Sequence, residues 1–332
     1  MDRIAFIIGE EFIYWNSIVL TLAAAVAILF FLSFYIGKCG NAVAGFAAVP
    51  VGIVLSLVFA RLIHWYSRTD SYTSFLSAMT DYTSGGYALM GVFAGCILTA
   101  VVLRLIFFHR NIPEMLDCMA IAGCAGITVG RLASFFNSSD RGQILESITS
   151  LPLAYPVTNA VSGAVEYRLA TFVLQAVAAL LLFLILAAFY TRGNREEELR
   201  DGDTALIFLL IYGASQVVLD STRYDSLFFR SNGFVSIVQV FSAIALGFAI
   251  VMFSIRMVKA RGFKFWQVLL WLLMAVGIGC AGFMEYYVQR HGNEAVFAYS
   301  VMSACLACVI LLTLLIRLIA VSAERKQLNS VG

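Results

Sequence analysis

Charge is scarce in this chain. Only 13% of its 332 residues are Asp, Glu, Lys or Arg, against about 25% in ordinary soluble proteins. Hydrophobic residues make up 61% of the sequence, and so large an apolar excess has to face lipid. The composition therefore excludes a soluble fold and predicts an integral membrane protein.

Other familiar patterns are missing as well. The apolar runs are continuous instead of alternating within short segments, which excludes a transmembrane β-barrel. No Gly-rich loop stands between a strand and a helix, no internal repeat recurs, and residues 1–11 lack the basic start of a signal peptide. We therefore expect neither a nucleotide-binding site nor a cleaved leader, and we expect the first span to remain as an anchor.

Long apolar runs recur along the chain, and a bilayer span needs about 20 residues of helix. We expect nine spans, at residues 16–35, 42–66, 86–108, 116–136, 172–190, 204–218, 235–257, 265–286 and 296–320. The predicted fold class is all-α, a polytopic transmembrane helix bundle. A basic segment at 259–264 leads us to divide it into a seven-span core, residues 1–258, and a two-span C-terminal extension, residues 259–332.

The basic residues fall in alternate loops, and such loops are usually cytoplasmic. They are Lys38, Arg110, Arg192, Arg195, Arg200, Arg256, Lys259, Arg261, Lys264, Arg325 and Lys326. The opposite loops include the long polar insert 137–167, interpreted as a mobile lid or an unstructured connector. This distribution predicts an N-terminus outside and a C-terminus in the cytoplasm.

Ionisable residues within spans cost about 2.5 to 3.5 kcal/mol on insertion scales, so each indicates a partner or a function. The candidates are Arg61, Asp117, Arg131, Asp220 and Arg223. Arg131 ends the fourth span beside Ser134, Asn137 and Asp140. A guanidinium in polar company suits a phosphate or a lipid headgroup, because it binds phosphate oxygens in a bidentate manner. An equally valid interpretation is that Arg131 snorkels to the interface or pairs with a carboxylate to lock two helices.

A second polar group follows in the sixth span. Tyr212, Gln216, Asp220 and Arg223 occur at spacings of four, four and three residues, which predicts that they share one helical face. That face is too polar to point at lipid, so we expect it to line the bundle interior or a water-filled cavity. Asp220 and Arg223, near the outer end, would then meet Arg131.

The run 130–142 reads G-R-L-A-S-F-F-N-S-S-D-R-G. It resembles the signature of the prolipoprotein diacylglyceryl transferase family, G-R-x-(G/A)-N-F-hydrophobic-N-x-E-x-x-G. Seven of the nine specified positions agree, while Ser134 and Ser139 stand where the family has Asn and Glu. Further matches occur in the same order over about residues 10–257: F-A-R-L at 59–62, Gly85 with Gly86, Asp117, Y-G and D-x-x-R in the sixth span, and Gln239 with Ser242.

The resemblance implies a reaction. A diacylglyceryl group would move from phosphatidylglycerol to the lipobox cysteine of a preprolipoprotein, at the outer face of the bacterial cytoplasmic membrane. The partners would be this lipid and the lipobox peptide, with no nucleic acid. The implied catalytic residues are Arg131, Asp220 and Arg223. The implied substrate-binding residues are Ser134, Asn137, Gly142, Tyr212, Gln216 and Arg61. No metal and no cofactor are expected, and we interpret the C-x-x-C of Cys305 and Cys308 as packing within a span.

Three positions depart from the family. Met90 stands in place of the histidine of H-G-G, Gln216 in place of an arginine and Asp220 in place of a glutamate. We expect His64, His109 and His291 to be interfacial or loop residues. One hypothesis is a divergent transferase, in which Arg223 or Arg61 supplies the second cation and Asp220 the base. A second is a catalytically degenerate, lipid-binding accessory protein on the same scaffold. A transporter is a third, for which the sequence offers no inverted repeat.

Overall fold

The structure is a computed structural model. It describes residues 4–9, 11–39, 41–81, 86–107, 111–137, 139–145, 150, 152–159, 162–195, 200–229, 232–290 and 294–328. Gly85, His109, Arg110 and His291 of the sequence predictions lie outside the described residues. The chain forms two compact units, Met1–Phe208 with Thr222–Val238 and Leu209–Ser221 with Gln239–Gly332.

Within the described ranges, nine helices are long and apolar enough to cross a membrane. They are α1 (Trp15–Cys39), α2 (Ala42–Ser67), α4 (Leu89–Ile106), α5 (Ile112–Leu132), α6 (Thr171–Arg195), α7 (Asp203–Ser221), α8 (Ile237–Arg261), α9 (Phe265–Arg290) and α10 (Ala295–Leu328). Each predicted span overlaps one of these helices, so the helix-bundle fold of a multi-pass membrane protein is confirmed. The division of the chain at residue 258 stays a prediction.

Several short elements connect the spans. They are the helices η1 (Thr69–Ser71), α3 (Phe75–Thr80) and η2 (Ala133–Phe135), and the antiparallel pairs β1 (Ile4–Ile8) with β2 (Glu11–Tyr14), β3 (Ala154–Thr158) with β4 (Val165–Leu169), and β5 (Phe228–Phe229) with β6 (Asn232–Ser236). The sequence predicted none of them. The pair β3–β4 lies largely within the polar insert 137–167, so the described part of that insert contains an ordered hairpin.

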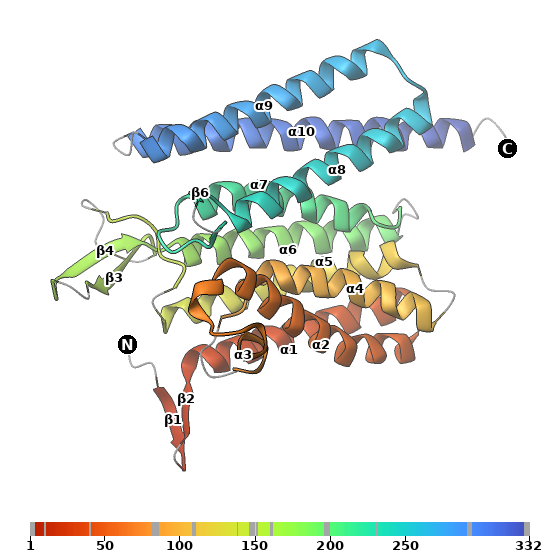
Figure 1. Cartoon of the computed structure of the whole chain (residues 1–332). Coiled ribbons are helices and arrows are strands. Elements are labelled where there is room, and N and C mark those ends of the chain that lie inside the picture. The colour runs from red at the N-terminus through yellow and green to blue at the C-terminus, as the bar shows by residue number, and fades with distance from the viewer. Residues whose placement is uncertain are drawn as a thin grey trace. The chain divides into compact units, whose positions relative to one another are not determined.

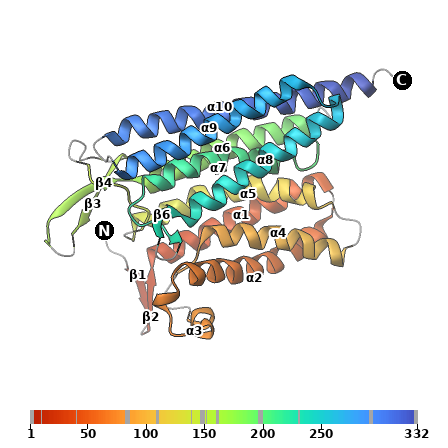
Figure 2. The ribbon, with the colours of Figure 1, turned by 45° about the horizontal axis from the view of Figure 1, so that its top comes forward.

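In the first unit α1 packs against α5, α2 against α4, and α5 against α6 (Figures 1 and 2). Side-chain contacts fix the two ends of this layer. At one end Trp15 stacks on Phe136, which follows α5, with ring centroids 5.7 Å apart. At the other end Lys38 Nζ lies 3.7 Å from Glu114 Oε1 and 3.1 Å from Asp201 Oδ1.

Hydrogen bonds from the backbone offset the energetic cost of burying Asp117. Its fully buried carboxylate accepts the backbone N–H groups of Gly202 and Ala205, each at 2.7 Å. These groups lie at the start of α7, where the first amides of a helix have no partner within the helix. A carboxylate there satisfies the amides and complements the positive end of the helix.

Helices α2 and α4 approach each other through glycine. Gly91 and Gly95 stand four residues apart on α4, in the small-xxx-small spacing that lets backbones come close. A Cβ on Gly91 would lie 2.3 Å from the carbonyl oxygen of Phe59, and one on Gly95 would lie 2.5 Å from the Cα of Ser56. Neither position therefore has room for a side chain.

In the second unit, the two helices of the predicted extension pack against each other (Figure 1). The hydroxyl of Tyr299 on α10 donates to the carbonyl of Ser221 on α7 at 3.2 Å. Trp271 Nε1 on α9 donates to Ser254 Oγ on α8 at 3.1 Å. The extension is thus bonded to both α7 and α8.

We predict that Gly91→Ala lowers the melting temperature of the purified protein. An added methyl group in a packed helix interface costs about 1 to 3 kcal/mol. Gly123→Ala on α5 is the control, because a Cβ there has no described neighbour within 4 Å. Equal melting temperatures for the wild type and Gly91→Ala would contradict the close approach of α2 and α4.

Candidate functional site

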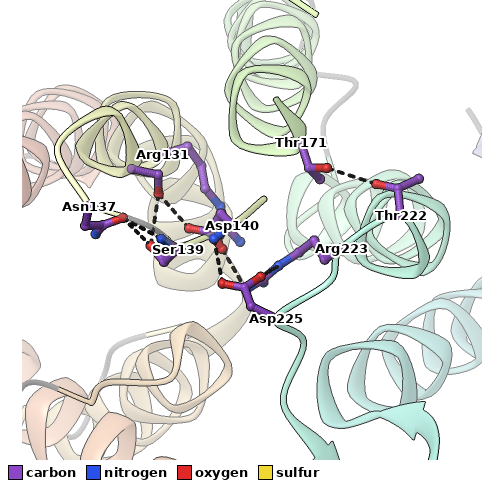
Figure 3. A network of polar contacts seen from close by, with 9 residues as sticks. Arg131, Asn137, Ser139, Asp140, Thr171, Thr222, Arg223 and Asp225 are labelled. Atoms are coloured by element: carbon purple, nitrogen blue, oxygen red, sulfur yellow. Dashed lines mark hydrogen bonds and ion pairs between the residues drawn. The ribbon is translucent and has the colours of Figure 1, made fainter. Parts of the chain in front are cut away.

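A network of polar residues of the first unit lies where the chain leaves α5 and η2 (Figure 3). Asn137 Oδ1 accepts the backbone N–H of Ser139 at 2.9 Å and its hydroxyl at 2.6 Å. This turn, in which a side chain mimics the backbone, is typical of Asn. The next residue, Asp140, has a φ of 58°, in the left-handed region that residues with a Cβ seldom adopt. Together the two features direct the Asp140 side chain back towards the end of α5.

Asp140 lies between two arginines. Its Oδ1 is 2.9 Å from Arg131 Nη1 and 2.8 Å from Arg223 Nη2. Its Oδ2 accepts the hydroxyl of Ser134 at 2.7 Å, and its backbone N–H donates to Asp225 Oδ2 at 2.8 Å. Arg223 Nη2 also lies 3.1 Å from Asp225 Oδ1. The sequence predicted that Asp220 and Arg223 meet Arg131. The structure brings Arg223 to Arg131 through Asp140, a carboxylate to which the prediction gave no role.

The two arginines keep Asp140 ionised. Burial alone would raise the pKa of this carboxyl, but the charges of Arg131 and Arg223 outweigh burial and lower the pKa to about 2. The cluster also contains Arg141 and Asp225, so three arginines and two aspartates leave a formal charge of +1. A partly buried cluster with net positive charge favours an anionic ligand.

Gly142 fixes the backbone of this loop. Its N–H donates to the carbonyl of Leu169 at 2.8 Å, and it forms an antiparallel bridge with Arg223. A Cβ at this position would lie 2.7 Å from both Leu169 Cβ and Thr171 Oγ1, and 2.9 Å from the carbonyl oxygen of Thr222. Only glycine fits, and its bridge sets Arg223 beside Asp140.

Arg141 is a buried cation that sequence reasoning missed. Its guanidinium carbon lies 3.9 Å from the ring centroid of Tyr155, and its Nη2 donates to the carbonyls of Ser134 and Asn137. Its Nε and Nη1 have no hydrogen-bond partner in the part of the chain that the structure describes. The family signature leaves this position open, and the one available signal was a second arginine in the same polar run.

The predicted polar face of the sixth span is correct for three residues and wrong for the fourth. Tyr212, Gln216 and Asp220 are buried on α7, in agreement with the expected interior position. Arg223 is not on that face, because α7 ends at Ser221. The reason is that Arg223 pairs its backbone with Gly142 and its side chain with two aspartates, which a continued helix would prevent.

Arg61 uses its donors within the protein. Its Nη1 donates to the carbonyl of Gly86 at 3.0 Å, and its other nitrogens donate to the carbonyls of Ala78 and Asp81. The guanidinium carbon lies 5.2 Å from the ring centroid of Tyr72. Arg61 therefore ties the connection between α2 and α4 to the end of α2.

The position of the family histidine is apolar. Met90 is buried in the first turn of α4. His64, near the end of α2, has its Nδ1 3.0 Å from the hydroxyl of Tyr72. The imidazole of His64 thus has a partner of its own, close to Gly86, where an added Cβ would lie 2.5 Å from its ring.

The chain is similar in sequence to known proteins. A family model described as prolipoprotein diacylglyceryl transferase matches residues 3–255. A phosphatidylglycerol–prolipoprotein diacylglyceryl transferase of Streptococcus sanguinis is 27% identical over 204 residues, 60% of this chain and 76% of that protein. One of Streptococcus pyogenes serotype M3 is 26% identical over 270 residues, 80% of this chain and 99% of that protein. Helices α9 and α10 lie beyond the residues that the family model matches.

We predict that Asp140 makes stability depend on acid pH. An aspartate in an unfolded chain titrates near pH 3.9. Because the folded pKa is lower, about 2, the carboxylate stabilises the fold above about pH 4, and this contribution is lost as the pH falls from about 4 to 2. The difference in melting temperature between the wild type and Asp140→Asn should therefore be constant near neutral pH and shrink in that acid window. A difference that stays constant down to about pH 2 would contradict the ion pairs of Asp140.

Proposed function

Because the chain belongs to the prolipoprotein diacylglyceryl transferase family, we propose that it transfers a diacylglyceryl group from phosphatidylglycerol to the lipobox cysteine of a prolipoprotein. The observation that carries this proposal is the meeting of Arg131 and Arg223 at Asp140, within the residues that match the family. The names of the streptococcal relatives support the same substrates.

The chemistry needs cations and a base. The cysteine sulfur forms a bond to the terminal glyceryl carbon, the bond from that carbon to the phosphate oxygen breaks, and glycerol phosphate leaves. The thiol proton goes to a base, since the thiolate is the nucleophile. Negative charge develops on the leaving phosphate, so donors placed there in advance accelerate the reaction.

Arg131 is suited to hold that phosphate. Among the described residues it forms a hydrogen bond only through Nη1, to Asp140. Its Nε and Nη2 are left for two phosphate oxygens, the bidentate geometry that arginine favours. We assign the second cation to Arg223 and not to Arg61, whose nitrogens already donate to three carbonyls.

The other residues have supporting roles in this proposal. Ser134, Asn137 and Gly142 shape the loop that presents the two arginines. We also assign substrate binding to Tyr212 and Gln216 and the role of the base to Asp220, three residues that are buried on α7.

We place this site at the outer face of the bacterial cytoplasmic membrane. The network follows the end of α5 at which Trp15 stacks on Phe136, while Lys38 and Glu114 mark the opposite end. Basic loops favour the cytoplasm, so the end with Lys38 is inside and the network is outside. The N-terminus would then be outside and the C-terminus inside.

A second candidate function is that of a lipid-binding accessory protein without turnover. The observation in its favour is the buried, apolar Met90 where the family has a histidine, together with Gln216 in place of an arginine. It predicts binding of phosphatidylglycerol with no transfer.

We predict that Arg131→Ala reduces transfer by about 100-fold or more, the loss typical of removing one donor to a developing oxyanion. The assay follows labelled diacylglyceryl from phosphatidylglycerol to a lipobox peptide with purified protein. Arg104→Ala is the control, because Arg104 is exposed in the last turn of α4. Full transfer by Arg131→Ala would refute the assigned role, and lipid binding without transfer by the wild type would favour the accessory protein.

A further inference from the structure

A carboxylate lies between Arg131 and Arg223, although the residue at the signature position for a carboxylate is a serine in this chain. The family signature has a glutamate where this chain has Ser139. We propose that Asp140, one residue later, is the positioning residue that holds Arg131 and Arg223 side by side for the substrate phosphate. This inference rests on the proposed function and deepens it.

The backbone explains how a shift of one residue is tolerated. In an extended chain neighbouring side chains point to opposite sides, so a carboxylate moved by one position would face away from its former partners. Here the left-handed φ of Asp140 changes the direction of the chain at that residue. Ser139 instead bonds to Asn137 Oδ1 and completes the turn that leads into Asp140.

Backbone hydrogen bonds hold this unfavourable conformation. The N–H of Asp140 donates to Asp225 Oδ2 at 2.8 Å, and its carbonyl accepts the N–H of Phe172 at 3.2 Å. A conformation that residues with a Cβ seldom adopt persists only where its surroundings determine it, and such positions concentrate at functional sites.

Asp140 matters more for the position of the Arg131 guanidinium than for that of the Arg223 guanidinium. Within the described residues Asp140 is the single hydrogen-bonding partner of Arg131, whereas Arg223 also bonds to Asp225. The two guanidinium groups contact the same oxygen, Asp140 Oδ1, at 2.9 and 2.8 Å. Without its negative charge the two cations would repel each other, and Arg131 would lose the contact that directs its remaining donors.

The test compares three variants. Asp140→Asn removes the charge but keeps the shape, and Asn tolerates a left-handed φ. The double variant Ser139→Glu with Asp140→Asn returns a carboxylate to the signature position. Glu166→Gln is the matched control, because it removes an ion pair with Arg168, 3.0 Å long, that involves neither arginine of the network. Each protein is first shown to be monodisperse and to melt cooperatively.

We expect Asp140→Asn to lose about 100-fold in kcat/KM for transfer from phosphatidylglycerol, as misplaced catalytic groups do, and the double variant to regain about tenfold or more. Glu166→Gln should transfer like the wild type. Wild-type transfer by Asp140→Asn would overturn the inference. So would a folded double variant no more active than Asp140→Asn, because the loss would then come from the fold at residue 140.

Lipid binding separates this inference from the proposed function. Binding is measured to phosphatidylcholine vesicles with and without phosphatidylglycerol. If the wild type binds the anionic lipid but transfers nothing, loss of binding in Asp140→Asn and recovery in the double variant would support Asp140 while the transferase proposal fails. Equal binding by the wild type and Asp140→Asn, or no phosphatidylglycerol-dependent binding by the wild type, would overturn the inference.

Discussion

One carboxylate that two arginines share organises the polar end of the first unit. Two partly buried guanidinium groups repel each other where the effective dielectric constant is below that of water, so an anion between them stabilises their approach. Asp140 supplies that anion, and Asp225 supplies a second one to Arg223. Backbone hydrogen bonds join the residues next to Asp140 to two other segments. Gly142 bonds to Leu169 at the end of the hairpin β3–β4, and Arg141 bonds to Tyr224 in the segment after α7.

Two other buried charged residues of the first unit also have partners that offset their burial. Asp117 is buried, and the amides at the start of α7 satisfy it. Arg61 is buried, and three backbone carbonyls satisfy it. In both cases a charged side chain serves backbone groups that a helix end or a connection leaves without a partner. Arg131 is different, since within the described residues it forms a hydrogen bond only through Nη1, to Asp140, and this difference underlies its proposed role in binding a ligand.

The spans were predictable because lipid imposes one length and one composition on any helix that crosses it. The site was predictable as far as residues 130–142 follow the family signature, which contains Arg131 and Gly142. The central role of Asp140 was not predictable, because it depends on a left-handed backbone and on a partner 85 residues away. The prediction for Arg223 failed for a related reason. The spacing from Asp220 to Arg223 suits a helix. The backbone of Arg223 instead pairs with Gly142, and α7 ends at Ser221, two residues before Arg223.

The order in which the network closes follows from the separation of its members along the chain. Arg131 and Asp140 are nine residues apart, so their ion pair can form while the chain is still emerging from the ribosome. An ion pair formed at that stage would neutralise the guanidinium before its helix passes into lipid, where an unpaired charge is costly. Arg223 and Asp225 are synthesised only after two further spans, α6 and α7, have followed. The formal charge of +1 is therefore set by Arg131, Asp140 and Arg141, and the later arrival of Arg223 and Asp225 completes the contacts of the network without changing that charge.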